Sequence, residues 1–271
     1  MNDFRISTLL ITLTLSGAAL RAQPNPASIV KLPGVLQITT DRAGDFYAIT
    51  GESIHKYDSN GNELHIIKTP SPATLFDPGN GVRLLTYLRE AQEYIIYPPS
   101  LSPREAIAID LTFAIEPWLV CSSGDYNLVI LDAADWSVKK IDTRRSVVDN
   151  EFSLDPDTSI EPDYVFMREY QGFLFLLDRV NGIDIYNRLG MKLKSLPVEG
   201  LLSFNFLGQE LYYFKDGRIH FTDLFTLETR SVAFEGPYTD VVIGNGRSLA
   251  LLPDGLAFFS FAPGKTSETD R

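Results

Sequence analysis

Six glycines recur along the chain at intervals of 36 to 48 residues, and each stands shortly before an apolar run. A four-stranded unit of roughly 40 residues cannot bury both faces of its sheet alone, so repeats of this length pack against their neighbours. The spacing therefore predicts an all-β fold, a β-propeller in which each repeat forms one blade. The recurring residues are Gly44, Gly81, Gly124, Gly172, Gly208 and Gly246.

The first repeat shows the plan expected of a blade. Runs at residues 35–39, 45–49, 53–57 and 63–68 predict four strands, and the dipeptide Asn60-Gly61 lies between the third and the fourth. Asn-Gly supplies the positive φ angles of a tight hairpin turn. Four short strands joined by tight turns are therefore expected in a blade.

The two ends of the chain complement each other. The last repeat, at residues 239–261, offers only three strands, while an unmatched strand at residues 28–32 precedes the first repeat. Pairing them would close the ring and cover an exposed strand edge. We expect one domain over residues 23–262, a propeller of six four-stranded blades closed by an N-terminal strand that completes the last blade. Residues 263–271 are expected to form a flexible C-terminal tail.

Two stretches carry a family resemblance. Residues 44–64 and 172–190 each contain an apolar strand preceded by glycine, and then a hairpin. Each ends in a segment in which an aromatic residue is followed by Asp or Asn and, three residues later, by Gly. This pattern resembles the NHL-type propeller repeat. The chain as a whole is similar to exported, functionally uncharacterised six-bladed propellers of Gram-negative envelopes. The resemblance implies a place in the envelope and leaves the function open.

The N-terminus resembles a secretory signal. An apolar run at residues 6–19 follows Arg5, is too short to span about 30 Å of hydrocarbon, and precedes the sequence Leu-Arg-Ala-Gln at residues 20–23. We expect a signal peptide over residues 1–22, with cleavage after Ala19 and an uncleaved anchor as alternatives. The expected location is the periplasm or the periplasmic face of the outer membrane, with no direct membrane span.

Composition excludes several classes of function. A net charge of −11 does not favour binding to nucleic acid or to anionic lipid. The single cysteine, Cys121, lies in an apolar run and is expected to be buried in a strand rather than to act as a nucleophile. The three histidines, His55, His65 and His220, stand at no metal-ligand spacing.

An acidic segment is the most distinctive candidate site. Residues 149–162 form the longest expected loop on the face where ligands of propellers bind, and with residue 163 they carry six acids and no base. Oxygen ligands at alternate positions imitate a calcium loop, yet the required glycine and distal glutamate are missing. We expect no cofactor and keep three alternatives: a recognition loop for a cationic protein patch, a solvated insertion, and a calcium site. The acids are Asp149, Glu151, Asp155, Asp157, Glu161 and Asp163.

Four aromatic residues are a second candidate. A groove lined by aromatic side chains on the loop face would bind a sugar or a peptide. Three of the four stand at expected strand ends, where packing between blades uses the same residue types, so both interpretations stay open. The residues are Phe113, Trp118, Trp136 and Tyr164.

The favoured function is a non-catalytic interaction or scaffold module of the cell envelope. Its expected partner is another envelope protein associated with the outer membrane, and this chain would be a soluble subunit of such a complex. The alternative is a metal-dependent hydrolase or lyase of the lactonase-like propeller type, a class that the NHL resemblance implies. The expected channel acids match no motif of that class, so no catalytic residue is assigned. These acids are Asp77, Glu116, Asp163, Glu199 and Asp240.

Overall fold

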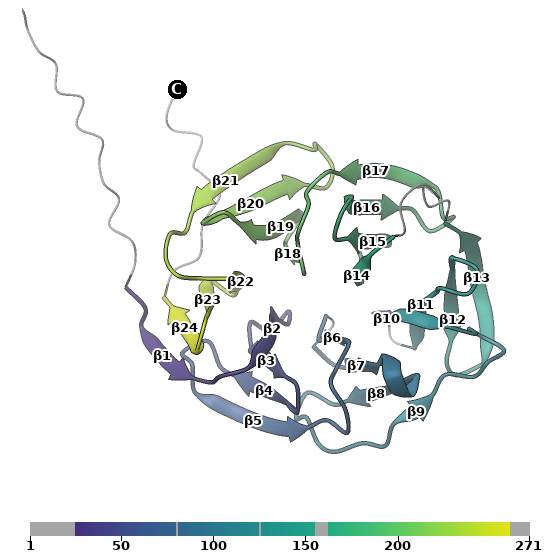
Figure 1. Cartoon of the computed structure of the whole chain (residues 1–271), viewed down its shortest axis with the longest axis horizontal. Helices are drawn as coiled ribbons and strands as arrows, with labels where there is room; N and C mark the ends of the chain where they lie inside the picture. Colours follow the sequence, from purple (N-terminus) through teal and green to yellow (C-terminus); the bar gives the residue numbers. More distant parts are fainter. Residues whose placement is uncertain (1–24, 80, 125, 155–161, 261–271) are drawn as a thin grey trace, which may run out of the picture.

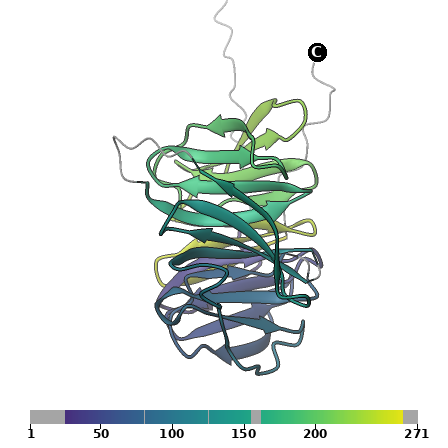
Figure 2. The same ribbon diagram turned by 90° about the vertical axis from the view of Figure 1, so that its right-hand side faces the viewer.

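The protein is a six-bladed β-propeller. The computed structural model describes residues 25–79, 81–124, 126–154 and 162–260. Figure 1 looks down the axis of a ring of six four-stranded antiparallel sheets, and Figure 2 shows the same ring from its side. The predicted all-β fold and its number of blades are confirmed. Within the described part of the chain, no helix is long and apolar enough to cross a membrane.

Strands within a blade follow one another from the central channel to the rim. The first three blades are β2 (Val35–Thr40), β3 (Phe46–Thr50), β4 (Ser53–Tyr57) and β5 (Glu63–Lys68); β6 (Leu75–Asp77), β7 (Leu84–Leu88), β8 (Glu93–Tyr97) and β9 (Ile107–Ala108); and β10 (Pro117–Ser123), β11 (Asn127–Asp132), β12 (Ser137–Asp142) and β13 (Val147–Ser153). A 3-10 helix, η1 (Arg89–Ala91), joins β7 to β8.

The remaining blades repeat this order. Blades 4 to 6 are β14 (Tyr164–Tyr170), β15 (Phe173–Asp178), β16 (Gly182–Tyr186) and β17 (Lys192–Leu196); β18 (Asn205–Leu207), β19 (Glu210–Lys215), β20 (Arg218–Asp223) and β21 (Thr229–Ala233); and β22 (Asp240–Gly244), β23 (Arg247–Leu252) and β24 (Gly255–Phe259) with β1 (Ser28–Lys31) as the outermost strand.

Blade 6 takes its outer strand from the other end of the chain. β1 pairs antiparallel with β24, from Ser28 opposite Phe258 to Lys31 opposite Gly255. A Cβ atom on Gly255 would lie 2.3 Å from the carbonyl oxygen of Val30, so only glycine lets the two strands approach this closely. The first and last strands of the described chain are thus held side by side, as the sequence led us to expect.

The core lies between neighbouring blades. The second strand of a blade is buried on both faces, which explains continuous apolar runs such as Phe-Leu-Phe-Leu-Leu in β15. Outer strands such as β5 and β13 are mostly exposed. The blade 4 to blade 5 contact shows the packing: Phe166 meets Phe204 edge to face, and Phe175 meets Phe206 in the same way.

The expected loop at residues 149–162 is wrong in its first part. Residues Val147–Ser153 form β13, which pairs with β12 along its whole length. Phe152 turns inward, while the flanking Glu151 and Ser153 face solvent, so acidic residues on the outer face of the strand imitated a loop. The later part of the segment, with Asp155, Asp157 and Glu161, lies outside the described residues.

Candidate functional site

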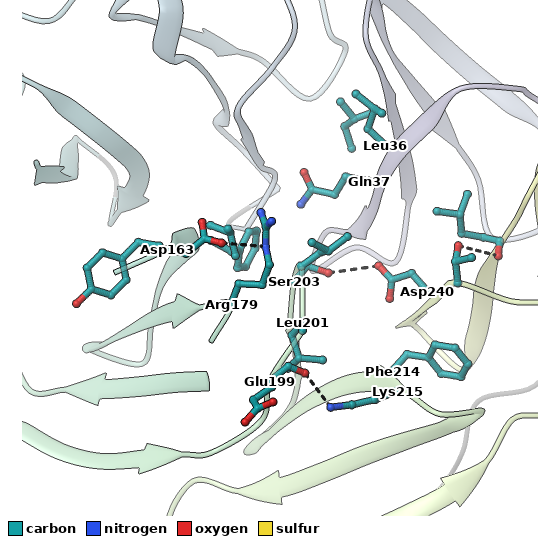
Figure 3. Close-up of a pocket in the computed structure, with 18 of the residues that line it drawn as sticks. Leu36, Gln37, Asp163, Arg179, Glu199, Leu201, Ser203, Phe214, Lys215 and Asp240 are labelled. Carbon is teal, nitrogen blue, oxygen red and sulfur yellow. Dashed lines mark hydrogen bonds and ion pairs between the residues drawn. The ribbon is translucent and has the colours of Figure 1, made fainter. Parts of the chain in front are cut away.

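A large cavity opens at one end of the central channel. The connections between blades and the hairpins between second and third strands meet there, and all six blades line a volume of about 1330 Å³. We call it the mouth cavity; Figure 3 shows part of its wall. This is the end of the ring at which ligands and partners were expected to bind.

The basic side chains of the mouth cavity are held by local partners. Arg179 Nε lies 3.3 Å from Asp163 Oδ2, and Lys215 Nζ donates to the backbone carbonyl of Glu199 at 2.8 Å. Arg89 Nε donates to the carbonyl oxygen of Trp118 at 2.8 Å, and its guanidinium group lies 3.8 Å from the centre of the Trp118 ring. The cavity wall therefore carries cations that are already oriented and engaged.

Asp240 differs from these engaged groups. Its Oδ1 accepts a hydrogen bond from the backbone N–H of Val241 at 2.7 Å, and its Oδ2 accepts one from the hydroxyl of Ser203 at 3.3 Å. No ion pair reaches it from any residue that the structure describes. Burial raises the pKa of this carboxyl from its ordinary 3.8 to about 6, although both hydrogen bonds act in the opposite direction. Asp240 thus presents a poorly compensated carboxylate to the cavity.

Exposed apolar side chains stand among the lining residues. Leu36 on blade 1 is 61% exposed, Val180 on blade 4 is 46% exposed, and Leu202 before blade 5 is 65% exposed. Three apolar side chains from three blades therefore border one opening. Apolar surface gathered around a concave mouth is typical of an interaction site.

Three of the four aromatic candidates lie between blades 3 and 4. Trp118 Nε1 donates to the carbonyl oxygen of Tyr164 at 2.8 Å, and the rings of Trp136 and Tyr164 pack edge to face with centroids 5.5 Å apart. Phe113 packs against the same core. Tyr164 is buried, which raises the pKa of its hydroxyl. Interblade packing accounts for these contacts, while Trp118 and Tyr164 also line the mouth cavity.

The described acids of the predicted loop do not converge. Asp149 Oδ1 lies 2.7 Å from Arg145 Nη2, and Glu151 Oε1 lies 4.0 Å from Lys139 Nζ, both on the outer side of blade 3. Asp163 lines the mouth cavity and pairs with Arg179. In the described part of the chain, no three His, Cys, Asp or Glu side chains come close enough to hold a metal ion.

The five expected channel acids lie at different positions along the channel axis. Asp163, Glu199 and Asp240 line the mouth cavity, and Asp77 lines a smaller cavity of about 370 Å³ toward the other end. Glu116 lines neither of them. The channel prediction therefore holds for four of these side chains, but they do not form one cluster.

A buried polar network borders the smaller cavity, which shares no lining residue with the mouth cavity. Arg168 is 5% exposed; its Nη1 donates to Asn205 Oδ1 at 2.8 Å, its Nη2 to Thr39 Oγ1 at 3.4 Å, and its Nε lies 3.5 Å from Asp77 Oδ1. Asp77 also accepts the backbone N–H of Ser122 at 3.1 Å. Four blades thus meet at one guanidinium group, and blade 3 joins them through the contact of Ser122 with Asp77.

The Arg168 network was not predicted from the sequence. The available signal was a charged residue inside the apolar run Tyr-Val-Phe-Met-Arg of β14. A charge at a buried strand position needs a partner, but the partners stand on other blades and no local pattern identifies them.

Comparisons with known proteins support the fold alone. No protein-family model and no curated protein sequence matches the chain. Among solved structures, BBS1N in complex with ARL6DN has a TM-score of 0.54 at 15% identity, covering 89% of this chain and 79% of that one. Streptogramin B lyase has a TM-score of 0.53 at 11% identity, covering 87% and 85%. The Neurospora crassa Pan2 WD40 domain has 0.52 at 11%, covering 90% and 86%.

These similar structures show that the propeller fold is shared by proteins of different kinds. One is named as a lyase, one is a WD40 domain, and one was solved in complex with a second protein. At such low identity the likeness extends to the fold and to nothing narrower. The function must therefore be argued from the mouth cavity itself.

Replacing Arg168 should destabilise the whole ring. In Arg168→Met the Asp77 carboxylate stays buried without its cation, and we expect the free energy of unfolding to fall by about 3–5 kcal/mol. Arg179→Met, which breaks the exposed pair with Asp163, should cost less than about 1 kcal/mol. Urea denaturation of both variants measures the difference, and equal losses would show that the network carries no special weight.

The Asp240 carboxyl predicts a pH-dependent stability. The pKa of this carboxyl in the folded protein, about 6, exceeds the ordinary 3.8. Its contribution to the free energy of unfolding is therefore fully present below about pH 4 and is lost as the pH rises through 6. Asp240→Asn keeps the side-chain oxygen that accepts the Val241 N–H. At neutral pH its free energy of unfolding should exceed that of the wild type by about 1–2 kcal/mol, a value reduced because the Asp240 side chain is partly exposed.

The control for this measurement is Asp216→Asn, an exposed carboxylate in the same cavity wall. Urea denaturation between about pH 4 and pH 7 should show the Asp240→Asn advantage shrinking toward low pH, with no such trend for the control. A stability difference that stays constant over this range would contradict the assignment.

Proposed function

We propose that this chain is a non-catalytic protein-binding module that engages its partner through the face around the mouth cavity. The observation that carries this proposal is the set of exposed apolar side chains, Leu36, Val180 and Leu202, that border the cavity from three blades. Contact with water at these positions is unfavourable, and a partner surface would remove it. The similar propeller of BBS1N, solved in complex with ARL6DN, supports the idea that a ring of this kind binds a protein.

We propose that the module works in the cell envelope, where it belongs to an assembly associated with the outer membrane. The apolar run at residues 6–19 behind Arg5 supports export. The NHL-like pattern at residues 44–64 and 172–190 supports kinship with exported propellers. The net charge of −11 fits attachment through a protein partner rather than through anionic lipid.

The second candidate is a metal-dependent hydrolase or lyase that acts in the channel. The observation that favours it is the raised pKa of the Asp240 carboxyl. A carboxyl group with a raised pKa inside a cavity is typical of an acid-base site. The side chain that contacts the Asp240 carboxyl is Ser203, through its hydroxyl. This hydroxyl is neutral and does not act as a second titratable group. Binding is the simpler use of this arrangement.

Loss of the apolar border should abolish partner capture. Tagged protein purified gently from its own cells is expected to bring down one stoichiometric envelope protein, identified by mass spectrometry. In Leu36→Ser with Leu202→Ser, capture should fall about tenfold or more, because two apolar contacts leave the interface. The fold should stay intact, since both side chains are exposed.

The matched control is Leu189→Ser with Met191→Ser. These side chains are 82% and 59% exposed and lie in the turn before β17, away from the mouth cavity. Capture should be unchanged in this variant. Capture that depends on Leu189 and Met191 instead, or a wild-type protein that purifies alone, would overturn the proposed binding face.

Export predicts a shortened protein. Intact-mass measurement of the chain recovered from the periplasmic fraction should give a product that begins at Gln23, with a start at Leu20 as the alternative cleavage. A chain that retains Met1 and stays in the cytoplasmic fraction would contradict the proposed location. The tag for this measurement belongs at the C-terminus.

A further inference from the structure

We propose that Asp240 receives a cationic group, an ammonium or guanidinium carried by a basic side chain of the partner protein, inside the mouth cavity. This inference rests on the proposed function and adds the chemistry of the contact. Asp240 is the first residue of β22, and its carboxylate stands in the wall of a cavity of about 1330 Å³. That volume exceeds the roughly 300–1000 Å³ of ordinary ligand pockets, so the tip of another protein's side chain has room to enter.

The contacts of Asp240 orient the carboxylate without neutralising it. Both donors, the Val241 N–H and the Ser203 hydroxyl, are neutral groups. Together they hold the two oxygens in place on the cavity wall, as Figure 3 shows for the Ser203 contact. A carboxylate that is fixed and partly desolvated gains more from an incoming cation than a free surface carboxylate does.

The chain's own cations in this cavity are committed elsewhere. Arg179 pairs with Asp163, and Lys215 donates to the Glu199 carbonyl. Arg89 donates to Trp118 and stacks on its ring. None of these three basic groups of the cavity wall forms an ion pair with Asp240 in the described structure, which leaves its charge for a group that comes from outside.

The surroundings fit an organic cation on an aliphatic stem. Leu201 and Leu251 line the same cavity and can cover the methylene groups of a lysine or arginine side chain. Gln37, on the neighbouring blade, adds a neutral amide that can accept a further N–H. A hard metal ion takes six or more oxygen ligands, and among the described residues no three His, Cys, Asp or Glu side chains come close enough to hold one.

Blocked amino acids test the contact directly. Isothermal titration calorimetry of the purified full chain with N-acetyl-arginine amide should show saturable binding, and the neutral isostere N-acetyl-citrulline amide should bind about tenfold more weakly or worse. Asp240→Asn should lose about tenfold in affinity for the arginine derivative, while Asp216→Asn should stay within about twofold of the wild type. Asp216 is the matched control because it is an exposed carboxylate of the same cavity.

The inference is overturned if the arginine derivative does not bind, if the citrulline derivative binds equally well, or if Asp240→Asn binds like the wild type. Partner capture then identifies the source of the cation. Capture that falls in Asp240→Asn supports a basic side chain of the partner. Capture that is unchanged while arginine binding is lost overturns the partner as the source and points to a small cationic molecule.

The two proposals fail separately. The variant with serine at positions 36 and 202 should still bind the arginine derivative, because it keeps Asp240 and its two donors. If that variant also keeps the partner, the proposed binding face is wrong, whatever the calorimetry shows. If it loses the partner and Asp240→Asn does not, the binding face stands and the inference about Asp240 falls.

Discussion

The pairing of β1 with β24 is the constraint on which the rest of the ring depends. Each blade of a propeller is stable because its two faces pack on neighbours, and an open ring would leave one face of two blades in water. Four residue pairs, from Ser28 with Phe258 to Lys31 with Gly255, join the first strand of the described chain to the last. The mouth cavity is lined by all six blades, so its shape follows from this closure.

A second constraint acts at the axis rather than at the rim. Arg168 draws Asp77, Asn205 and Thr39 toward one point from three other blades. Apolar packing between blades is non-directional, whereas this network fixes distances across the channel. Arg168, Asp77 and Asn205 line the smaller cavity, which shares no lining residue with the mouth cavity.

The sequence predicted those parts of the fold that local chemistry determines. The runs at residues 35–39, 45–49, 53–57 and 63–68 match β2 to β5 within about one residue at each end, because turns such as Asn60-Gly61 mark where strands stop. β13 was missed because its outward positions are acidic and its inward ones offer little beyond Phe152. The Arg168 network was beyond prediction, since Thr39 and Arg168 are 129 positions apart.

The sequence likewise predicted only part of the candidate site. The sequence pointed to the end of the ring at which the mouth cavity opens and named Asp240 among the channel acids, yet its preferred acidic segment lies partly on the rim of blade 3. What distinguishes Asp240 is the environment that other blades create: Ser203 comes from blade 5, and Arg179 on blade 4 is already paired. A catalytic acid would need a second reactive group aimed at the same point, whereas a counter-ion for a bound cation needs only a fixed position and an open approach. The described contacts of Asp240 meet the second requirement, which is why a binding role follows from the geometry more directly than a chemical one.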